Sequence, residues 1–115
     1  MVLTESFKNA VIGYISPHID VMKFGTDGTV ESESDTALKA IVSGSTHAAV
    51  VNSFNKGYSV SSVLGSGSVE DGSTLKEGGI FLDDGTPTMH SRFTFYDFAK
   101  TGDDETTFIS VVHVE

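Results

Sequence analysis

Four histidines are the side chains of this sequence best suited to acid–base or metal chemistry: His18, His47, His90 and His113. No two of them have the three- or four-residue spacing that would bring both rings to one ion on a helix. His18 and Asp20 fall on one face of an extended segment, but this pattern is common by chance. We therefore expect surface histidines, or histidines with ordinary hydrogen-bond partners, and no metal site.

Carboxylates form two clusters that could offer oxygen ligands to calcium. The first lies in the polar segment Thr26–Asp35 and the second at Asp103–Glu105. The first cluster alternates acidic with other residues, but it lacks the mid-loop glycine and the closing glutamate of an EF-hand. We expect both segments to be solvated loops, and Thr26–Asp35 to project outward as a whole. Asp83–Gly85 is explained by turn formation.

Motifs of covalent catalysis and of nucleotide binding are missing from the sequence. Gly65–Ser68 does not have the spacing or the strand–turn–helix context of a nucleophile elbow. No glycine-rich phosphate loop occurs, and no two carboxylates are placed at a catalytic separation. The sequence therefore predicts neither an enzyme nor a cofactor.

The composition is that of one acidic globular domain covering residues 1–115. The net charge is −9, and the seven basic residues are scattered singly, so we expect no direct contact with nucleic acid. No apolar run approaches the roughly 20 residues of a membrane span, and the first residues lack the pattern of a signal peptide. Cysteine is absent.

Local patterns predict one short helix followed by about six strands. Thr4 is the expected N-cap of a helix that contains Phe7 and Tyr14 and ends at Ser16–Pro17. Asp35 is expected to cap a helical turn over Thr36–Ala40. Asn55–Gly57 is expected to be a three-residue hairpin loop, with Gly57 in the left-handed conformation. Strands are expected at Ile19–Gly25, Ile41–Val42, His47–Phe54, Tyr58–Leu64, Leu75–Leu82, Thr88–Phe98 and Thr106–Val114.

The fold class that follows is mainly β: an antiparallel β-sandwich or barrel of about six to eight strands with one short N-terminal helix. Gly65–Thr74 is expected to be a flexible surface loop.

The strand signal is strongest at Thr88–Phe98. Phe93 and Phe95 alternate with Arg92, Thr94 and Tyr96, so the two phenylalanines share a face and are expected to be buried together. Arg92, the only arginine, allows two interpretations. It is either an exposed residue with its stem on the sheet, or one partner of an ion pair with an acid of the next strand or of another subunit.

Several segments follow one another in a characteristic order: Tyr14–Ile15, Met22–Thr29, Ser34–Leu38 and Leu75–Phe81, then Met89, Arg92, Phe95, Lys100 and a terminal strand. Taken in this order, they resemble small structural proteins of tailed phages, of the tail-fibre or virion type. The resemblance begins with the N-terminal helix and Tyr14–Ile15, and it covers nearly the whole chain. Gly78 departs from it, because a bulky or charged residue is expected there; a bulge at Gly78 would explain this glycine.

The resemblance implies a non-enzymatic protein of the virion, located on the tail or on the capsid surface and made in the host cytoplasm. It would form a homo-oligomer, for which we expect a trimer, and would contact other virion proteins. The abundance of aromatic residues agrees with this interpretation, because some of them could face partner subunits. Candidate assembly or core residues are Phe7, Tyr14, Arg92, Phe93 and Phe95.

A carbohydrate-binding β-sandwich is the alternative from another functional class; it would attach the particle to a host-surface glycan. Tyr14, Tyr58 and Tyr96 are its stacking candidates. The absence of tryptophan weighs against this alternative.

Overall fold

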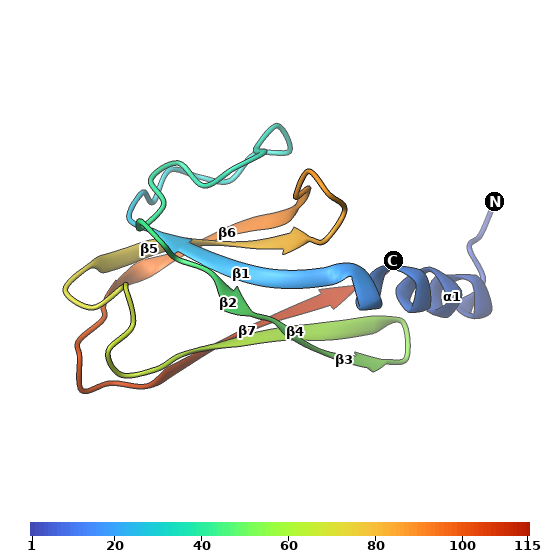
Figure 1. Ribbon diagram of the computed structural model, residues 1–115. Coiled ribbons are helices and arrows are strands. Elements are labelled where there is room, and N and C mark those ends of the chain that lie inside the picture. Colours follow the sequence, from blue (N-terminus) through green and yellow to red (C-terminus); the bar gives the residue numbers. More distant parts are fainter.

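Two antiparallel sheets packed face to face form the body of the protein, as a computed structural model of residues 1–115 shows (Figure 1). Sheet A has the strand order β2-β1-β5-β6, and sheet B has the order β3-β4-β7. The elements are α1 (Glu5–Ile15), a 3-10 turn (Ser16–His18), β1 (Ile19–Gly25), β2 (His47–Ala48), β3 (Val50–Phe54), β4 (Gly57–Leu64), β5 (Thr74–Leu82), β6 (Met89–Ala99) and β7 (Thr106–His113). The predicted mainly β fold with a short N-terminal helix is confirmed.

Inward-facing side chains of both sheets make the core. Sheet A contributes Met22, Phe24 and Ile80, and sheet B contributes Val60 and Leu64, all without exposed surface. These residues alternate with outward-facing ones along their strands, as a two-layer sandwich requires. The chain passes from sheet A to sheet B between β2 and β3, where Ala49 interrupts the pairing.

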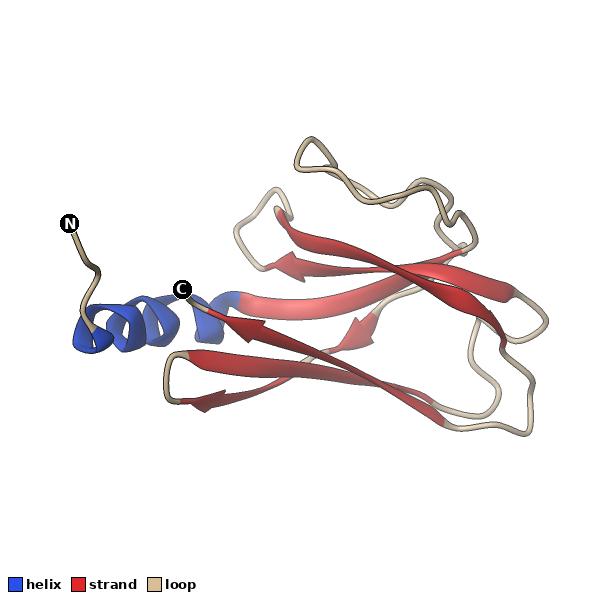
Figure 2. Cartoon of the chain, turned by 180° about the vertical axis from the view of Figure 1, so that it is seen from behind, coloured by secondary structure: helices blue, strands red, loops and turns tan.

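Helix α1 extends from one end of the sandwich rather than lying across a sheet, which gives the molecule a length of 48 Å against 28 and 27 Å (Figure 2). The side chain of Thr4 accepts a hydrogen bond from the backbone N–H of Phe7, so the predicted cap is confirmed. The helix ends before the turn that contains Pro17, also as predicted. No helix has both the length and the apolar character that crossing a bilayer would need.

The hairpin between β3 and β4 differs from the prediction. Its loop is Asn55–Lys56, Lys56 has the positive φ of 61°, and Gly57 already pairs with Phe54 inside the strand. Gly57 is required for another reason: a Cβ there would meet the ring of Phe54 and the backbone oxygen of Val112. The glycine thus permits close packing instead of forming the turn.

The excursion between β1 and β2 contains none of its predicted regular elements. Thr36–Ala40 is not helical, and Ile41 makes only an isolated bridge to Gly25. The excursion instead runs over the outer face of sheet A, where it appears in Figure 1 as the blue-green segment above β1, β5 and β6. Its last part is fixed to the end of β1, because Thr26 donates to the oxygen of Ala40 and Val42 donates to that of Phe24.

Candidate functional site

A buried ion pair joins β5 and β6 on the outer face of sheet A. Glu77 and Arg92 point away from the sandwich core, and the Nε of Arg92 lies 2.9 Å from Oε1 of Glu77. Neither side chain is more than 1% exposed, because the β1–β2 excursion covers them. One of the two interpretations of Arg92 is confirmed, the ion pair with an acid of the neighbouring strand; the exposed position is wrong.

The pair holds the excursion against the sheet. The Glu77 carboxylate accepts hydrogen bonds from the backbone N–H groups of Lys39 at 2.9 Å and Ala40 at 2.8 Å. The Arg92 guanidinium donates to the backbone oxygens of Thr29 at 2.8 Å and Asp27 at 3.1 Å. Two charges with this many partners can be buried without an unsatisfied group. This cluster is structural.

The same cluster shows why the acidic segment Thr26–Asp35 does not project outward as a whole. The Asp35 side chain is 5% exposed and lies 3.4 Å from Nη1 of Arg92. The backbone N–H of Ser32 lowers the pKa of Asp35, and Lys39 and Arg92 lower it further, against the opposing effect of desolvation. Glu31 and Glu33 are exposed. The prediction of a solvated loop is therefore right for these two glutamates and wrong for Asp35.

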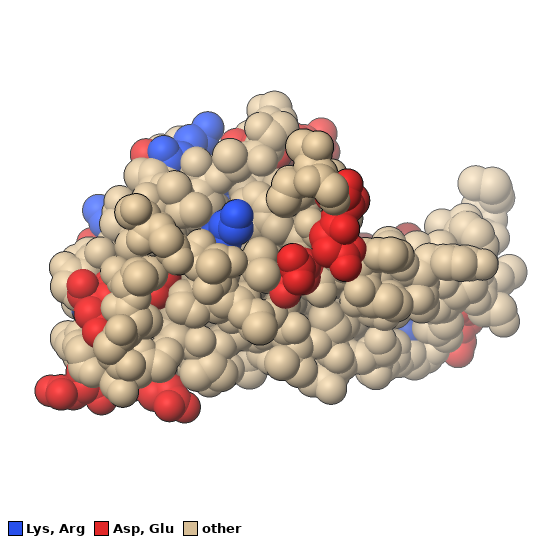
Figure 3. All heavy atoms as spheres, viewed as in Figure 1, with Lys and Arg blue, Asp and Glu red and all other residues tan.

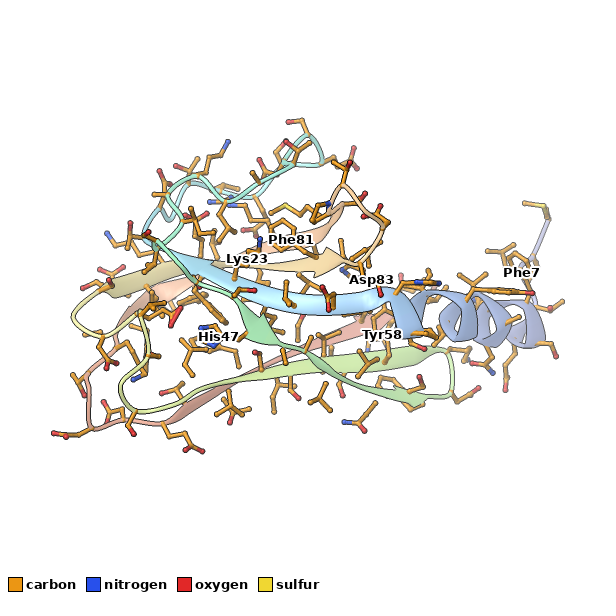
Figure 4. The ribbon with its side chains drawn as sticks, in the orientation of Figure 1. Phe7, Lys23, His47, Tyr58, Phe81 and Asp83 are labelled. Carbon is orange, nitrogen blue, oxygen red and sulfur yellow. The ribbon has the colours of Figure 1, made fainter.

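Three of the four histidines have a side-chain partner, and these partners lie far apart in the fold. Nδ1 of His18 lies 3.1 Å from Oδ1 of Asp83, and Nε2 of His47 lies 2.8 Å from Oε2 of Glu70. Figure 4 labels His47 near the middle of the sandwich and Asp83 close to the start of β1. No group of three histidine, cysteine or acidic side chains comes together in a way that could hold a metal ion.

Glu70 ties the Gly65–Thr74 loop to the body of the protein. Its side chain is fully buried, so this segment is not a surface loop throughout. Desolvation acts to raise the pKa of Glu70, but hydrogen bonds from His47 and Ser45 outweigh it, and the pKa falls below its usual value. Asp71 binds the buried amine of Lys100 at 2.7 Å, which secures the loop a second time.

His90 lies inside the sandwich next to Tyr58. The Tyr58 hydroxyl is 2.6 Å from Nε2 of His90, and Nδ1 of His90 is 2.9 Å from Oγ of Ser91. Burial lowers the pKa of His90 and raises that of Tyr58, since desolvation disfavours the charged form of each. Both groups are therefore neutral near pH 7. Tyr58 is 3% exposed and cannot be a stacking platform for a sugar.

Phe93 and Phe95 share a face of β6, as predicted, with ring centroids 6.2 Å apart. Both are half-buried and pack against the core instead of lying within it. Phe95 also contacts Phe108 of β7, with ring centroids 5.2 Å apart. The aromatic rings thus fill the side of the sandwich where β6 and β7 lie at the sheet edges.

Gly78 makes room for one of these rings. It pairs directly with Phe93 and is not itself a bulge residue; the register shifts lie between Leu75 and Glu77 and between Ile80 and Phe81. A Cβ on Gly78 would lie 2.5 Å from the ring of Phe93. The predicted bulge at Gly78 is wrong, because the glycine accommodates a cross-strand aromatic ring.

Helix α1 presents the apolar surface that makes it the candidate functional site. Ile12 is its only buried residue. At roughly 100° per residue, Phe7 and Tyr14 lie about 140° and 160° around the helix from Ile12. They are 53% and 79% exposed, so the side of α1 opposite the sandwich is apolar and has no partner in the chain.

Charged side chains are distributed unevenly over the surface. On the face seen in Figure 3, acidic atoms gather mainly on loops, and wide areas between them are uncharged. Besides the buried Ile12, polar contacts join the helix to the sandwich: Asn9 bonds the side chain of Asn55 at 3.1 Å and the backbone N–H of Lys56 at 2.8 Å.

Comparison of the chain with protein-family models, with curated proteins and with solved structures finds no match.

Proposed function

We propose that this protein is a non-enzymatic structural component of a tailed-virus particle, which assembles as a homo-oligomer on the tail or on the capsid surface. The observation that carries the proposal is the exposed apolar side of α1, opposite the buried Ile12. The ordered sequence resemblance to virion structural proteins supports the same assignment. The protein would then act through the contacts it makes.

The short length of α1 supports a role in assembly. It has 11 residues, and an isolated helix of this length is marginally stable in water unless its apolar side is covered. Phe7, Ala10 and Tyr14 follow one another at three- and four-residue steps, which is the spacing of a helix–helix contact.

The charges of the helix are compatible with contacts between identical helices. Ser6 and Gly13 flank the apolar side, whereas Glu5 and Lys8 lie farther around the helix. Identical helices can therefore meet along this side without bringing like charges together. Three such helices around one axis would give the expected trimer.

Mass spectrometry of purified particles tests the proposal. The protein should be present in a fixed ratio to the major virion proteins, and antibody-labelled electron microscopy should place it on the tail or on the capsid surface. Its absence from particles that are washed but intact would refute the function.

One observation favours the carbohydrate-binding alternative. Tyr96 is 99% exposed and lines a shallow pocket together with Gly28, Thr94 and Phe95. An exposed aromatic ring beside such a hollow can stack on a sugar. A glycan array, screened with and without calcium, tests this function; Tyr96→Ala should abolish any signal that comes from this pocket.

A further inference from the structure

Strand β7 is an unprotected edge. It pairs on one side only, with β4, in a register of eight residue pairs without a bulge. Thr106–His113 contains no proline, lysine, arginine or acid. Natural sheets usually protect an edge with such residues or with bulges, because a bare edge recruits another strand.

The other free edge on this side of the sandwich shows the contrast. Strand β6 carries two register shifts relative to β5, and it bears the exposed acid Asp97. Its edge therefore has the irregularity and the charge that β7 lacks. This difference indicates that β7, rather than β6, is the edge strand available for pairing with a strand of another chain.

The outer face of sheet B is also free of formal charge. Exposed Val50, Val63, Ile109 and Val111 lie on it, and Ile109 is 67% exposed. Although the net charge of the chain is −9, the outward side chains of this sheet include no Asp, Glu, Lys or Arg, and His113 is the only titratable residue among them. The outward residues of this face are Val50, Asn52, Phe54, Ser59, Ser61, Val63, Thr107, Ile109, Val111 and His113.

We propose that β7 pairs with β7 of a second copy of this chain, antiparallel, so that sheet B continues across the two molecules. Charge determines the direction. Parallel pairing would bring the Asp103–Glu105 turns of both copies together, whereas antiparallel pairing separates them. Alternation along the strand requires outward residues to face outward residues. The register with Ile109 opposite Ile109 meets this condition and places Glu105 of one copy opposite His113 of the other.

This inference rests on the homo-oligomer of the proposed function, but not on its location in a virus particle. It names a second contact besides α1, and this contact has two-fold symmetry. A two-fold contact gives assemblies with an even number of chains, whereas helix contacts alone around a three-fold axis give trimers. Native mass spectrometry of the purified protein distinguishes the two.

Cysteine crosslinking tests the pairing directly, because the chain has no cysteine and every disulfide would join two copies. Ile109→Cys should give a covalent dimer under mild oxidation, since opposed residues on paired strands come within disulfide reach. Tyr96→Cys, on the exposed face of β6, is the matched control and should remain monomeric on a denaturing gel. Equal crosslinking of both variants, or none of Ile109→Cys, would overturn the inference.

A charge at the same position provides a second, independent measurement. Ile109→Lys should weaken dimer formation at least tenfold in sedimentation experiments, while Tyr96→Lys should leave it unchanged. Circular dichroism checks that both variants are folded. An unchanged dimer in Ile109→Lys overturns the β7 contact. If Ile109→Lys weakens the dimer in solution but the protein is absent from virus particles, the β7 contact is supported and the virion function is refuted.

Discussion

The Nε of Arg92 and Oε1 of Glu77 lie 2.9 Å apart beneath a segment more than 30 residues away from both in sequence. The pair joins β5 to β6, and its remaining hydrogen bonds hold the β1–β2 excursion on the outer face of sheet A. A stretch without helix or strand thereby becomes a fixed layer of the fold.

Glu77→Gln should lower the free energy of unfolding by about 3–5 kcal/mol, because it leaves the buried Arg92 charge without its partner. Urea denaturation measures the loss. Glu33→Gln, in the exposed part of the same layer, is the control and should change stability by less than about 0.5 kcal/mol. A loss of similar size in both variants would mean that the excursion is not held by the ion pair.

Gly78→Ala should destabilise the protein by displacing the Phe93 ring. Phe93→Ala should cost less than the roughly 3 kcal/mol that marks the lower limit for a fully buried phenylalanine, because the ring is half-buried. Calorimetry of the single variants and of the Gly78→Ala, Phe93→Ala double variant separates the cost of the clash from the cost of losing the Phe93 ring. The double variant should lose less than the sum of the two single losses, since the clash disappears with the ring. Additive losses would contradict the proposed packing.

The regular elements could be predicted from the sequence because their signals are local. Alternation of apolar and polar residues identified β6 and β7 within about one residue, and Thr4 and Pro17 marked the ends of α1. The excursion could not be predicted, because its conformation depends on Glu77 and Arg92, which lie far along the chain. The errors at Gly57 and Gly78 have a related origin: the sequence does not show that the ring of Phe54 or of Phe93 occupies the space that a Cβ at these positions would need.

The candidate site could be predicted only in part. Phe7 and Tyr14 could be selected from the sequence as candidate assembly residues, because a short helix is marginally stable unless its apolar side is covered. The bare edge of β7 was visible as a run without charge from Thr106 to His113, but only the strand order showed that it is an edge.

Stability should fall as the pH drops below about 6.5, the ordinary pKa of histidine. Burial lowers the pKa of His90, so the unfolded chain takes up this proton at a higher pH than the folded one. Between the two pKa values the unfolded state binds more protons, and stability therefore rises with pH there. Urea titrations from pH 7.5 to 5.5 measure the slope. His90→Gln should flatten it and the exposed His113→Gln should not; an equal slope in all three proteins would contradict the assignment.

Calcium should leave thermal unfolding unchanged. Two acids of Thr26–Asp35 already have partners in the protein: Asp35 binds Arg92, and Glu31 accepts a hydrogen bond from Thr94 at 2.6 Å. A ligand that binds only the folded state would raise the melting temperature. Melting curves with calcium and with a chelator should therefore overlay. A rise that is lost in the Glu31→Gln, Glu33→Gln double variant would establish a calcium site in this loop.

Changes on the exposed side of α1 should weaken assembly more than they weaken the fold. Tyr14→Lys places a charge where the side chain is 79% exposed, and in a homo-oligomer that uses this helix the charges of all copies would meet. Sedimentation should then show dissociation into smaller species at micromolar concentration, while the melting temperature of the sandwich changes little. Deletion of residues 1–15 should also weaken assembly more than it weakens the sandwich, although it removes the buried Ile12 and therefore costs some stability.

Val30→Lys is the matched control for the helix, because Val30 is 78% exposed but lies in the β1–β2 excursion. It should leave the assembly intact. If Tyr14→Lys and Val30→Lys both form assemblies of the same size as the unaltered protein in sedimentation, α1 is not an assembly contact. The proposed function then loses the observation that carries it. If the dimer through β7 persists in Tyr14→Lys while larger species disappear, the helix and the strand edge are separate contacts of one assembly.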